Sequence, residues 1–253
     1  MPVEGQENLW AYQKRLRFVR SVIEDNFPAR HPSTITVLDI GCGNGSQLAL
    51  PLACGGFSVT GIDPDASSIT HAIGLSEGVA SARFLRASVD EVAEMFDVVI
   101  LSEVLEHVVD PAGLLKSGER RLNSDGLVIV TTPNGYGEFE LDSWLFGALR
   151  MQRVVDKLAS NRSKVMSSTD NDASGHIQFF TRGRLYRMFR MCGLTVWRAG
   201  AASLFAGPFA GHLLARSDRF IEWNAIVTDR LPMVLASGWY FALRRQQPAG
   251  VTE

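Results

Sequence analysis

"VLDIGCGNG", residues 37–45, is the stretch that decides the fold of this 253-residue chain. An apolar run broken only by Asp39 predicts a buried strand, and three glycines follow it at alternate positions. Clustered glycines indicate unusual backbone dihedrals or a close approach of the backbone to another group. The segment "SQLALPLA" (46–53) then has the composition of a helix. Strand, glycine turn and helix form the unit with which α/β proteins hold nucleotides.

Composition limits the class of protein. With 46% hydrophobic and 21% charged residues, the chain is typical of one larger globular domain or a domain with an insertion. The net charge of −2 gives no argument for a nucleic-acid partner. The cysteines Cys42, Cys54 and Cys192 lack metal-ligand spacing, which is typical of a reducing compartment. Charges throughout residues 9–27 predict no signal peptide, so a cytoplasmic location is expected.

Strand and helix patterns alternate along the chain, which predicts an α/β fold. We expect a Rossmann-like, doubly wound, mostly parallel seven-stranded sheet with helices on both faces. Helical insertions are expected after strand five and near the C-terminus. The other expected strands are 57–63, 82–88, 96–102, 194–200 and 238–245, and 124–134 is expected to hold a turn followed by the fifth strand. The other expected helices are 8–26, 67–76, 110–123 and 181–193.

The residues around the glycines indicate which class of nucleotide cofactor the turn would bind. A dinucleotide fold wants G-x-G-x-x-G, but Ser46 occupies the third glycine position here. Asp63 ends the second strand, where a carboxylate can accept both ribose hydroxyls of an adenosine. Nicotinamide and S-adenosylmethionine proteins share that feature. Asp39 would face an ammonium group well and a pyrophosphate badly, which favours S-adenosylmethionine.

At this point the sequence resembles the class I S-adenosylmethionine-dependent methyltransferases over about residues 35–135. The resemblance is carried by "VLDIGCGNG", "VTGIDPD" (59–65), "ASVDEV" (87–92), "FDVVILSEVLEHVVDP" (96–111) and "GLVIVTTPN" (126–134). Within the superfamily it is most similar to ubiquinone-biosynthesis O-methyltransferases and to bacterial methyltransferases of sugars, lipids and secondary metabolites.

The resemblance implies a cofactor site. At the position of Ser88, many family members have an aspartate, which contacts the amino group of adenine. A backbone contact at Val89 could replace it here. The resemblance does not extend with the same assurance beyond residue 135. From the order of patterns along the chain we expect one methyltransferase domain (1–253) with four segments: an N-terminal helical segment (1–34), a cofactor-binding core (35–135), a lid and substrate insertion (136–180) and a C-terminal part with a helix, strands and an apolar helical segment (181–253). The cofactor-binding residues that the resemblance implies are Asp39, Gly41, Cys42, Gly43, Gly45, Asp63, Pro64, Ser88, Val89, Ser102 and Glu103.

The segment "SEVLEHV" places Glu103, Glu106 and His107 at positions i, i+3 and i+4, on one face if the chain turns helically. With His176 they form a set similar to that of small-RNA 2′-O-methyltransferases, which hold magnesium or a similar ion. Three interpretations stay open. The four residues hold a divalent metal such as Mg or Mn, or His107 and His176 act as catalytic bases without metal, or the cluster is structural.

The expected reaction is methyl transfer to a hydroxyl oxygen of a small molecule, sugar or lipid-linked acceptor. A hydroxyl must lose its proton as it attacks, and either a histidine or a bound cation can assist. The alternatives are a metal-free N- or C-methyltransferase of a small metabolite, a non-catalytic S-adenosylmethionine-binding protein and a nicotinamide oxidoreductase.

The acceptor is expected beyond the carboxyl ends of the strands. Asn134, Tyr136 and Trp144 are candidate substrate residues, and the polar loop 161–175 is expected to close on binding. The apolar stretch 203–245 is expected either to pack on the sheet or to meet a membrane face or a second copy of the chain.

Overall fold

The computed structural model describes residues 7–8, 11–135, 175, 177–206 and 217–246. They form one seven-stranded sheet with the order β3-β2-β1-β4-β5-β7-β6. The first five strands are parallel, and β7 is antiparallel to both of its neighbours. The strands are β1 (Thr36–Ile40), β2 (Ser58–Asp63), β3 (Ala82–Arg86), β4 (Phe96–Ser102), β5 (Leu122–Pro133), β6 (Leu194–Ala201) and β7 (Gly238–Arg245).

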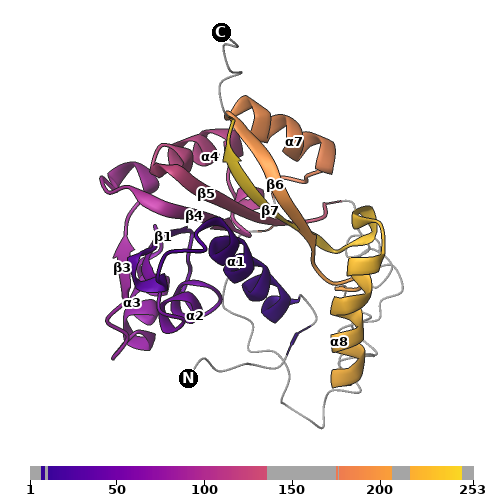
Figure 1. Ribbon diagram of the computed structural model, residues 1–253, viewed down its shortest axis with the longest axis horizontal. Coiled ribbons are helices and arrows are strands. Elements are labelled where there is room, and N and C mark those ends of the chain that lie inside the picture. Colours follow the sequence, from indigo (N-terminus) through magenta and orange to yellow (C-terminus); the bar gives the residue numbers. More distant parts are fainter. Residues whose placement is uncertain (1–6, 9–10, 136–174, 176, 207–216, 247–253) are drawn as a thin grey trace.

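Helices lie on both faces of the sheet, and α8 (yellow) stands to one side of it (Figure 1). The helices α1, α2 and α3 cover one face, and α4 and α7 cover the other. The helices are α1 (Tyr12–Asn26), α2 (Ala49–Cys54), α3 (Ala66–Leu75), α4 (Pro111–Glu119), α7 (Arg182–Met191) and α8 (Asp218–Val227). Short 3₁₀ turns are η1 (Pro32–Thr34), η2 (Val89–Glu91), η3 (Leu105–His107), η5 (Thr228–Arg230) and η6 (Met233–Leu235).

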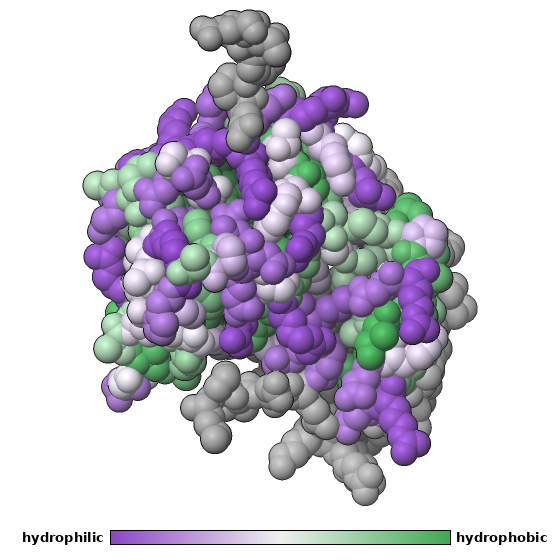
Figure 2. Space-filling model, in the orientation of Figure 1, coloured by the Kyte–Doolittle hydropathy of each residue, from purple (hydrophilic) through white to green (hydrophobic). Residues whose placement is uncertain are grey.

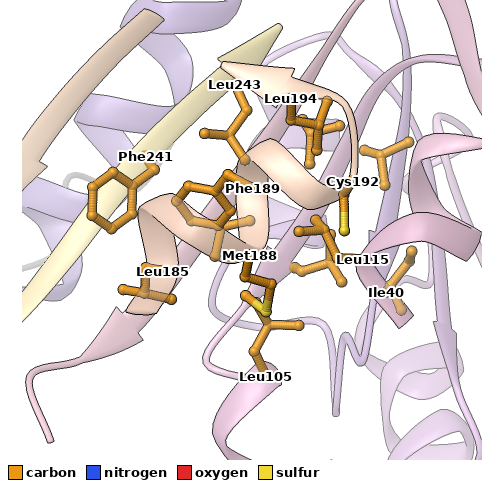
Figure 3. Close-up of a cluster of buried hydrophobic side chains, with 14 of the residues drawn as sticks. Ile40, Leu105, Leu115, Leu185, Met188, Phe189, Cys192, Leu194, Phe241 and Leu243 are labelled. Atoms are coloured by element: carbon orange, nitrogen blue, oxygen red, sulfur yellow. The ribbon is translucent and has the colours of Figure 1, made fainter. Parts of the chain in front are cut away.

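The two hydrophobic cores follow from the period-two alternation of the buried strands. In β1, Leu38 and Ile40 belong to the core under α4 and α7, and Val37 belongs to the core under α1, α2 and α3. Figure 3 shows the first core, where side chains of α7 meet Leu115 of α4 and Phe241 of β7. Burial on both faces explains why the parallel strands have nearly continuous apolar sequences.

The structure confirms the expected mostly parallel, seven-stranded fold with helices on both faces. Two boundaries expected around residue 123 are wrong. The helix expected over 110–123 ends at Glu119, and β5 begins at Leu122, before the turn that was expected to precede it. The strand starts early because Leu122 pairs with Phe96, and a register shift between Phe96 and Val98 accommodates the residues that were expected to form a turn.

The helix starts agree with their capping chemistry. Asp110 accepts a hydrogen bond from the amide of Gly113 at 2.8 Å, and Pro111 occupies the first turn of α4. Asp65 caps α3 and Thr181 caps α7 in the same way. These caps place α3 directly after β2 and α4 close after β4, so the loops between them form the carboxyl edge of the sheet.

Part of the expected architecture lies outside the described residues. This applies to the helical insertion and polar loop expected within 136–174, and to residues 207–216 of the apolar stretch. The rest of that stretch holds α8, which packs through the buried Asn224 and Ala225. None of the helices in the described ranges is long and apolar enough to cross a membrane. The surface is mostly hydrophilic in this view, with hydrophobic residues (green) near α3 and α8 (Figure 2).

Candidate functional site

The glycine turn after β1 has the backbone conformation that glycine allows. Gly41, Gly43 and Gly45 have φ angles of 70°, 54° and 73°. A Cβ at Gly41 would lie 2.6 Å from Val104, and one at Gly45 would lie 2.6 Å from Phe84. At Gly43 the same position has no atom within 4 Å. Gly41 and Gly45 therefore allow close packing, whereas Gly43 leaves the backbone open on one side.

Asp63 connects the end of β2 to this turn. Its Oδ2 accepts a hydrogen bond from the amide of Gly43 at 2.9 Å, and its Oδ1 accepts one from the amide of Asp65 at 2.9 Å. Each carboxylate oxygen has a second lone pair that can accept another donor. The geometry therefore holds a carboxylate next to the open side of the turn, in an orientation fixed by two backbone amides.

Asp39 is buried at the end of β1, with 3% of its surface exposed. Burial raises the pKa of this carboxyl to about 7, with Asp63 adding to the rise and Arg15 opposing it. A buried acid that titrates near neutrality gains from a cationic partner, because the cation stabilises its ionised form.

Arg15 of α1 is a residue that the sequence reasoning missed. It is 8% exposed, its guanidinium donates to Gln47, and its Nη1 lies 3.3 Å from Oε1 of Glu103. Its Nε is buried and has no hydrogen-bond partner within the described part of the chain. A signal existed, because Arg15 occupies the buried stripe of α1 together with Val19 and Val22.

Glu103 follows β4 in the left-handed region, with φ of 55°. For a residue other than glycine this costs about 1–3 kcal/mol. Contacts to Thr131 hold it there, since the amide of Glu103 donates to the Thr131 carbonyl at 3.0 Å and the Thr131 hydroxyl donates to Oε1 at 2.6 Å. Ser102 also hydrogen-bonds to the hydroxyl of Thr131, at 2.9 Å. The end of β4 is thus held rigidly beside Arg15.

Glu106 lies in η3 and is 2% exposed. The hydroxyl of Thr132 is 3.5 Å from its Oε2, and its Oε1 has no hydrogen-bond partner among the described residues. Burial, and then the nearby Glu103 carboxylate, raise the pKa of Glu106 well above its usual range. His107, the next residue, is half-buried. The structure therefore places a buried acid with a raised pKa directly before His107 in the chain, at the carboxyl edge of the sheet.

The proposed metal donors do not converge where the structure describes them. Within the described part of the chain, Glu103, Glu106 and His107 do not form a group that could hold a metal ion. Glu103 instead faces Arg15 and Thr131, and Glu106 is buried against Thr132. The fourth expected donor, His176, lies outside the described residues. The metal site expected from the sequence therefore stays a prediction, with three of its four donors not grouped where the structure describes them.

The expected adenine residues follow β3. The amide and the hydroxyl of Ser88 both donate to Oε2 of Glu91, at 2.7 Å each. Val89 is buried beside them and belongs to the core under α4. Pro64 follows the neighbouring strand β2, and its carbonyl accepts a hydrogen bond from the side chain of Arg86 at the end of β3. Ser88 therefore donates both its amide and its hydroxyl proton within its own turn.

Asn134 is buried and holds a neighbouring loop. Its Nδ2 donates to the carbonyls of Val234 at 3.0 Å and Ala236 at 2.9 Å. The expected substrate role of Asn134 is thus accompanied by a structural one, which ties η6 to the end of β5. The other two candidate substrate residues, Tyr136 and Trp144, lie outside the described residues.

Comparison with known families gives a match over most of the chain. A family model described as a methyltransferase domain matches residues 10–199. Among curated proteins, the ubiquinone biosynthesis O-methyltransferase of Caulobacter vibrioides is 41% identical over 133 residues, which are 47% of this chain and 51% of that protein. The protein of the same description from Rickettsia akari is 33% identical over 123 residues, 47% of this chain and 48% of that protein. The chain thus spans about half the length of the curated relatives it matches.

Solved structures share the fold at low sequence identity. Magnesium protoporphyrin IX methyltransferase from Synechocystis PCC 6803, with bound SAH, superposes with a TM-score of 0.55 at 16% identity, covering 96% of this chain and 89% of that one. An S-adenosylmethionine-dependent methyltransferase from Clostridium acetobutylicum gives 0.56 at 9% identity, covering 93% and 92%. At these identities the likeness concerns the fold.

Proposed function

Because this chain belongs to the methyltransferase domain family, we propose that it transfers the methyl group of S-adenosylmethionine to a hydroxyl oxygen of a small-molecule, sugar or lipid-linked acceptor. The observation that carries the proposal is the positive-φ glycine turn, open at Gly43, with Asp63 fixed beside it. The choice of oxygen is supported by the curated relatives, which are named as O-methyltransferases.

The residues around the turn fit the charged groups of this cofactor. We propose that Asp39 faces its ammonium group, because a cation compensates the burial of that carboxylate. Arg15, buried with an unused Nε donor, is proposed to face its carboxylate. Asp63 is proposed to accept the ribose hydroxyls through its remaining lone pairs, and the backbone of Val89 to meet the adenine. When bound, the cofactor supplies an activated methyl group on a sulfonium.

His107 is proposed as the base that takes the proton of the acceptor hydroxyl, because it lies at the carboxyl edge beside the rigid end of β4. Glu106 is buried, with 2% of its surface exposed, so its carboxyl is not open to an acceptor. We propose that Glu106 instead holds in place the carboxyl edge of the sheet, where the acceptor is proposed to bind (the acceptor edge). The metal-assisted form of the reaction is not proposed, since the described donors are not grouped.

Calorimetry and a transfer assay test this function together. Titration with S-adenosylmethionine should show binding, and NAD should show none. A screen with radiolabelled methyl donor and phenols, sugars and lipids should then find an acceptor. Binding of the cofactor without transfer to any of these classes would favour the non-catalytic binding protein, and binding of NAD in its place would favour an oxidoreductase.

Asp39 should make cofactor affinity depend on pH. Its pKa of about 7 means that the carboxyl is protonated in the free protein below neutrality, whereas an ammonium partner requires the ionised form. We therefore expect the affinity for S-adenosylmethionine to fall about tenfold for each pH unit below about 7 and to level off above it. Calorimetry across this range measures both the affinity and the proton released. In Asp39→Asn the affinity for the cofactor should be low and should no longer depend on pH in this range. If the wild-type affinity stays constant across the range, Asp39 does not bind the ammonium group.

A further inference from the structure

We propose that the outer surface of α4 and α7 binds an anionic phospholipid bilayer. The first reason is an imbalance of charge along the chain. Residues 175–217 contain six arginines and no aspartate or glutamate, although the whole chain has a net charge of −2. Four of these arginines lie in α7, where no acidic residue accompanies them. Basic side chains that are exposed and unpaired attract an anionic membrane surface electrostatically.

The inner face of α7 fixes where its arginines point. Leu185, Met188 and Phe189 are buried against the sheet (Figure 3). Three arginines consequently lie on the exposed side, namely Arg184, Arg187 and Arg190. Arg184 donates to the carbonyl of Phe179 and to Oε1 of Gln178, but no acidic side chain pairs with any of the three within the described residues.

Helix α4 packs beside α7 and extends the positive surface. Lys116 of α4 and Arg120, the residue that follows this helix, are exposed and form no ion pair within the described ranges. Of the acidic residues of this helix and its cap, Glu119 pairs with Arg245, whereas Asp110 caps the amide of Gly113 and remains an exposed negative charge at the start of α4. We call Lys116, Arg120, Arg184, Arg187 and Arg190 the α4–α7 surface. Its charge complements phosphate headgroups.

Exposed apolar side chains border this surface and favour a lipid over a nucleic acid. Val109, Ile177 and Phe179 are 85%, 54% and 41% exposed. They lie near one another, because the side chain of Gln178 donates to the carbonyl of Val109 at 3.3 Å. Aliphatic side chains gain by entering the boundary between headgroups and acyl chains. A nucleic-acid backbone offers them no such environment.

The apolar border lies next to the proposed acceptor edge. The amides of Ile177 and Gln178 both donate to the carbonyl of Glu106 at 3.0 Å. A bilayer on the α4–α7 surface would therefore present a lipid-borne acceptor close to His107. This consequence rests on the proposed function, whereas the binding of lipid does not.

Vesicle flotation tests the binding directly with the full chain. Wild-type protein should float with vesicles of phosphatidylcholine mixed with phosphatidylglycerol, and should stay behind with phosphatidylcholine alone. Binding should weaken as salt is added, because exposed charges are screened. The double change Arg187→Gln with Arg190→Gln should lower partitioning about 25-fold, at about fivefold for each charge. The double change Val109→Ser with Ile177→Ser should lower it about tenfold at unchanged charge.

The matched control is Arg219→Gln with Arg230→Gln, two exposed arginines of α8 and η5 that carry the same total charge. It should float like the wild type, and circular dichroism should show all variants folded. An equal loss in this control would move the binding surface to α8 and overturn the proposal. Binding to a DNA duplex in place of vesicles would overturn it in favour of a nucleic-acid surface. Calorimetry with S-adenosylmethionine on the same samples keeps a failure of lipid binding separate from a failure of the proposed function.

Discussion

Replacing His107 with alanine is expected to lower the turnover number at least about 100-fold, because a positioned base contributes that much to a reaction in which a hydroxyl loses its proton. The affinity for S-adenosylmethionine should stay within about twofold, since the proposed cofactor contacts come from Asp39, Asp63 and Arg15. Single-turnover methyl transfer and calorimetry on the same preparation measure the two quantities. His107 lies in η3, after the end of β4, and is not part of the glycine turn itself.

His71→Ala is the matched control, because His71 is exposed on α3 and has no part in the site. It should leave turnover unchanged. Excess EDTA should also leave wild-type turnover unchanged, since the described donors are not grouped as a metal site. Loss of turnover in EDTA would restore the metal interpretation and bring His176 back as a ligand. Full activity of His107→Ala would instead make the cluster structural.

The fold could be predicted because its signals are local and repeated. Each parallel strand is a short apolar run, and glycine, aspartate or proline marks the turn that follows it. The sequence "VLDIGCGNG" contains both signals, and the structure places its three glycines at positive φ as the cluster indicated. The boundary at β5 was missed because pairing of Leu122 with Phe96 is a tertiary contact that overrides the local turn signal of residues 124–126.

Parts of the site depend on contacts between distant segments, which sequence spacing does not reveal. Arg15 reaches Glu103 across 88 positions of the chain, and a charged residue in a helix has many possible partners. Spacing also predicted that Glu103, Glu106 and His107 share a helical face. The left-handed backbone at Glu103 breaks that periodicity, because it turns the chain before η3 begins. Asn134 likewise gained its partners, Val234 and Ala236, only through the fold.

Replacing Asp63 with alanine is expected to weaken S-adenosylmethionine binding by about 2–3 kcal/mol, or about 30- to 150-fold. Two losses add in this variant. The ribose hydroxyls lose a charged acceptor, and the amide of Gly43 loses the 2.9 Å hydrogen bond that holds the glycine turn in place. A cofactor must then order the turn when it binds, which costs further affinity. Calorimetry gives the affinity, and thermal unfolding reports the loss of the tether in the free protein.

Two variants separate these contributions. Asp63→Asn keeps one carbonyl oxygen that can accept from Gly43, so it should retain more of the thermal stability than Asp63→Ala while losing the charge-assisted ribose contact. Asp65→Ala removes an aspartate two positions away that caps α3 through the amide of Ser68. That variant should lower thermal stability slightly and leave cofactor affinity unchanged, because only the helix cap is lost. Unchanged affinity in Asp63→Ala would remove this residue from the ribose site, whereas an equal loss in Asp65→Ala would show that disturbance of the loop, and not the carboxylate of Asp63, controls binding.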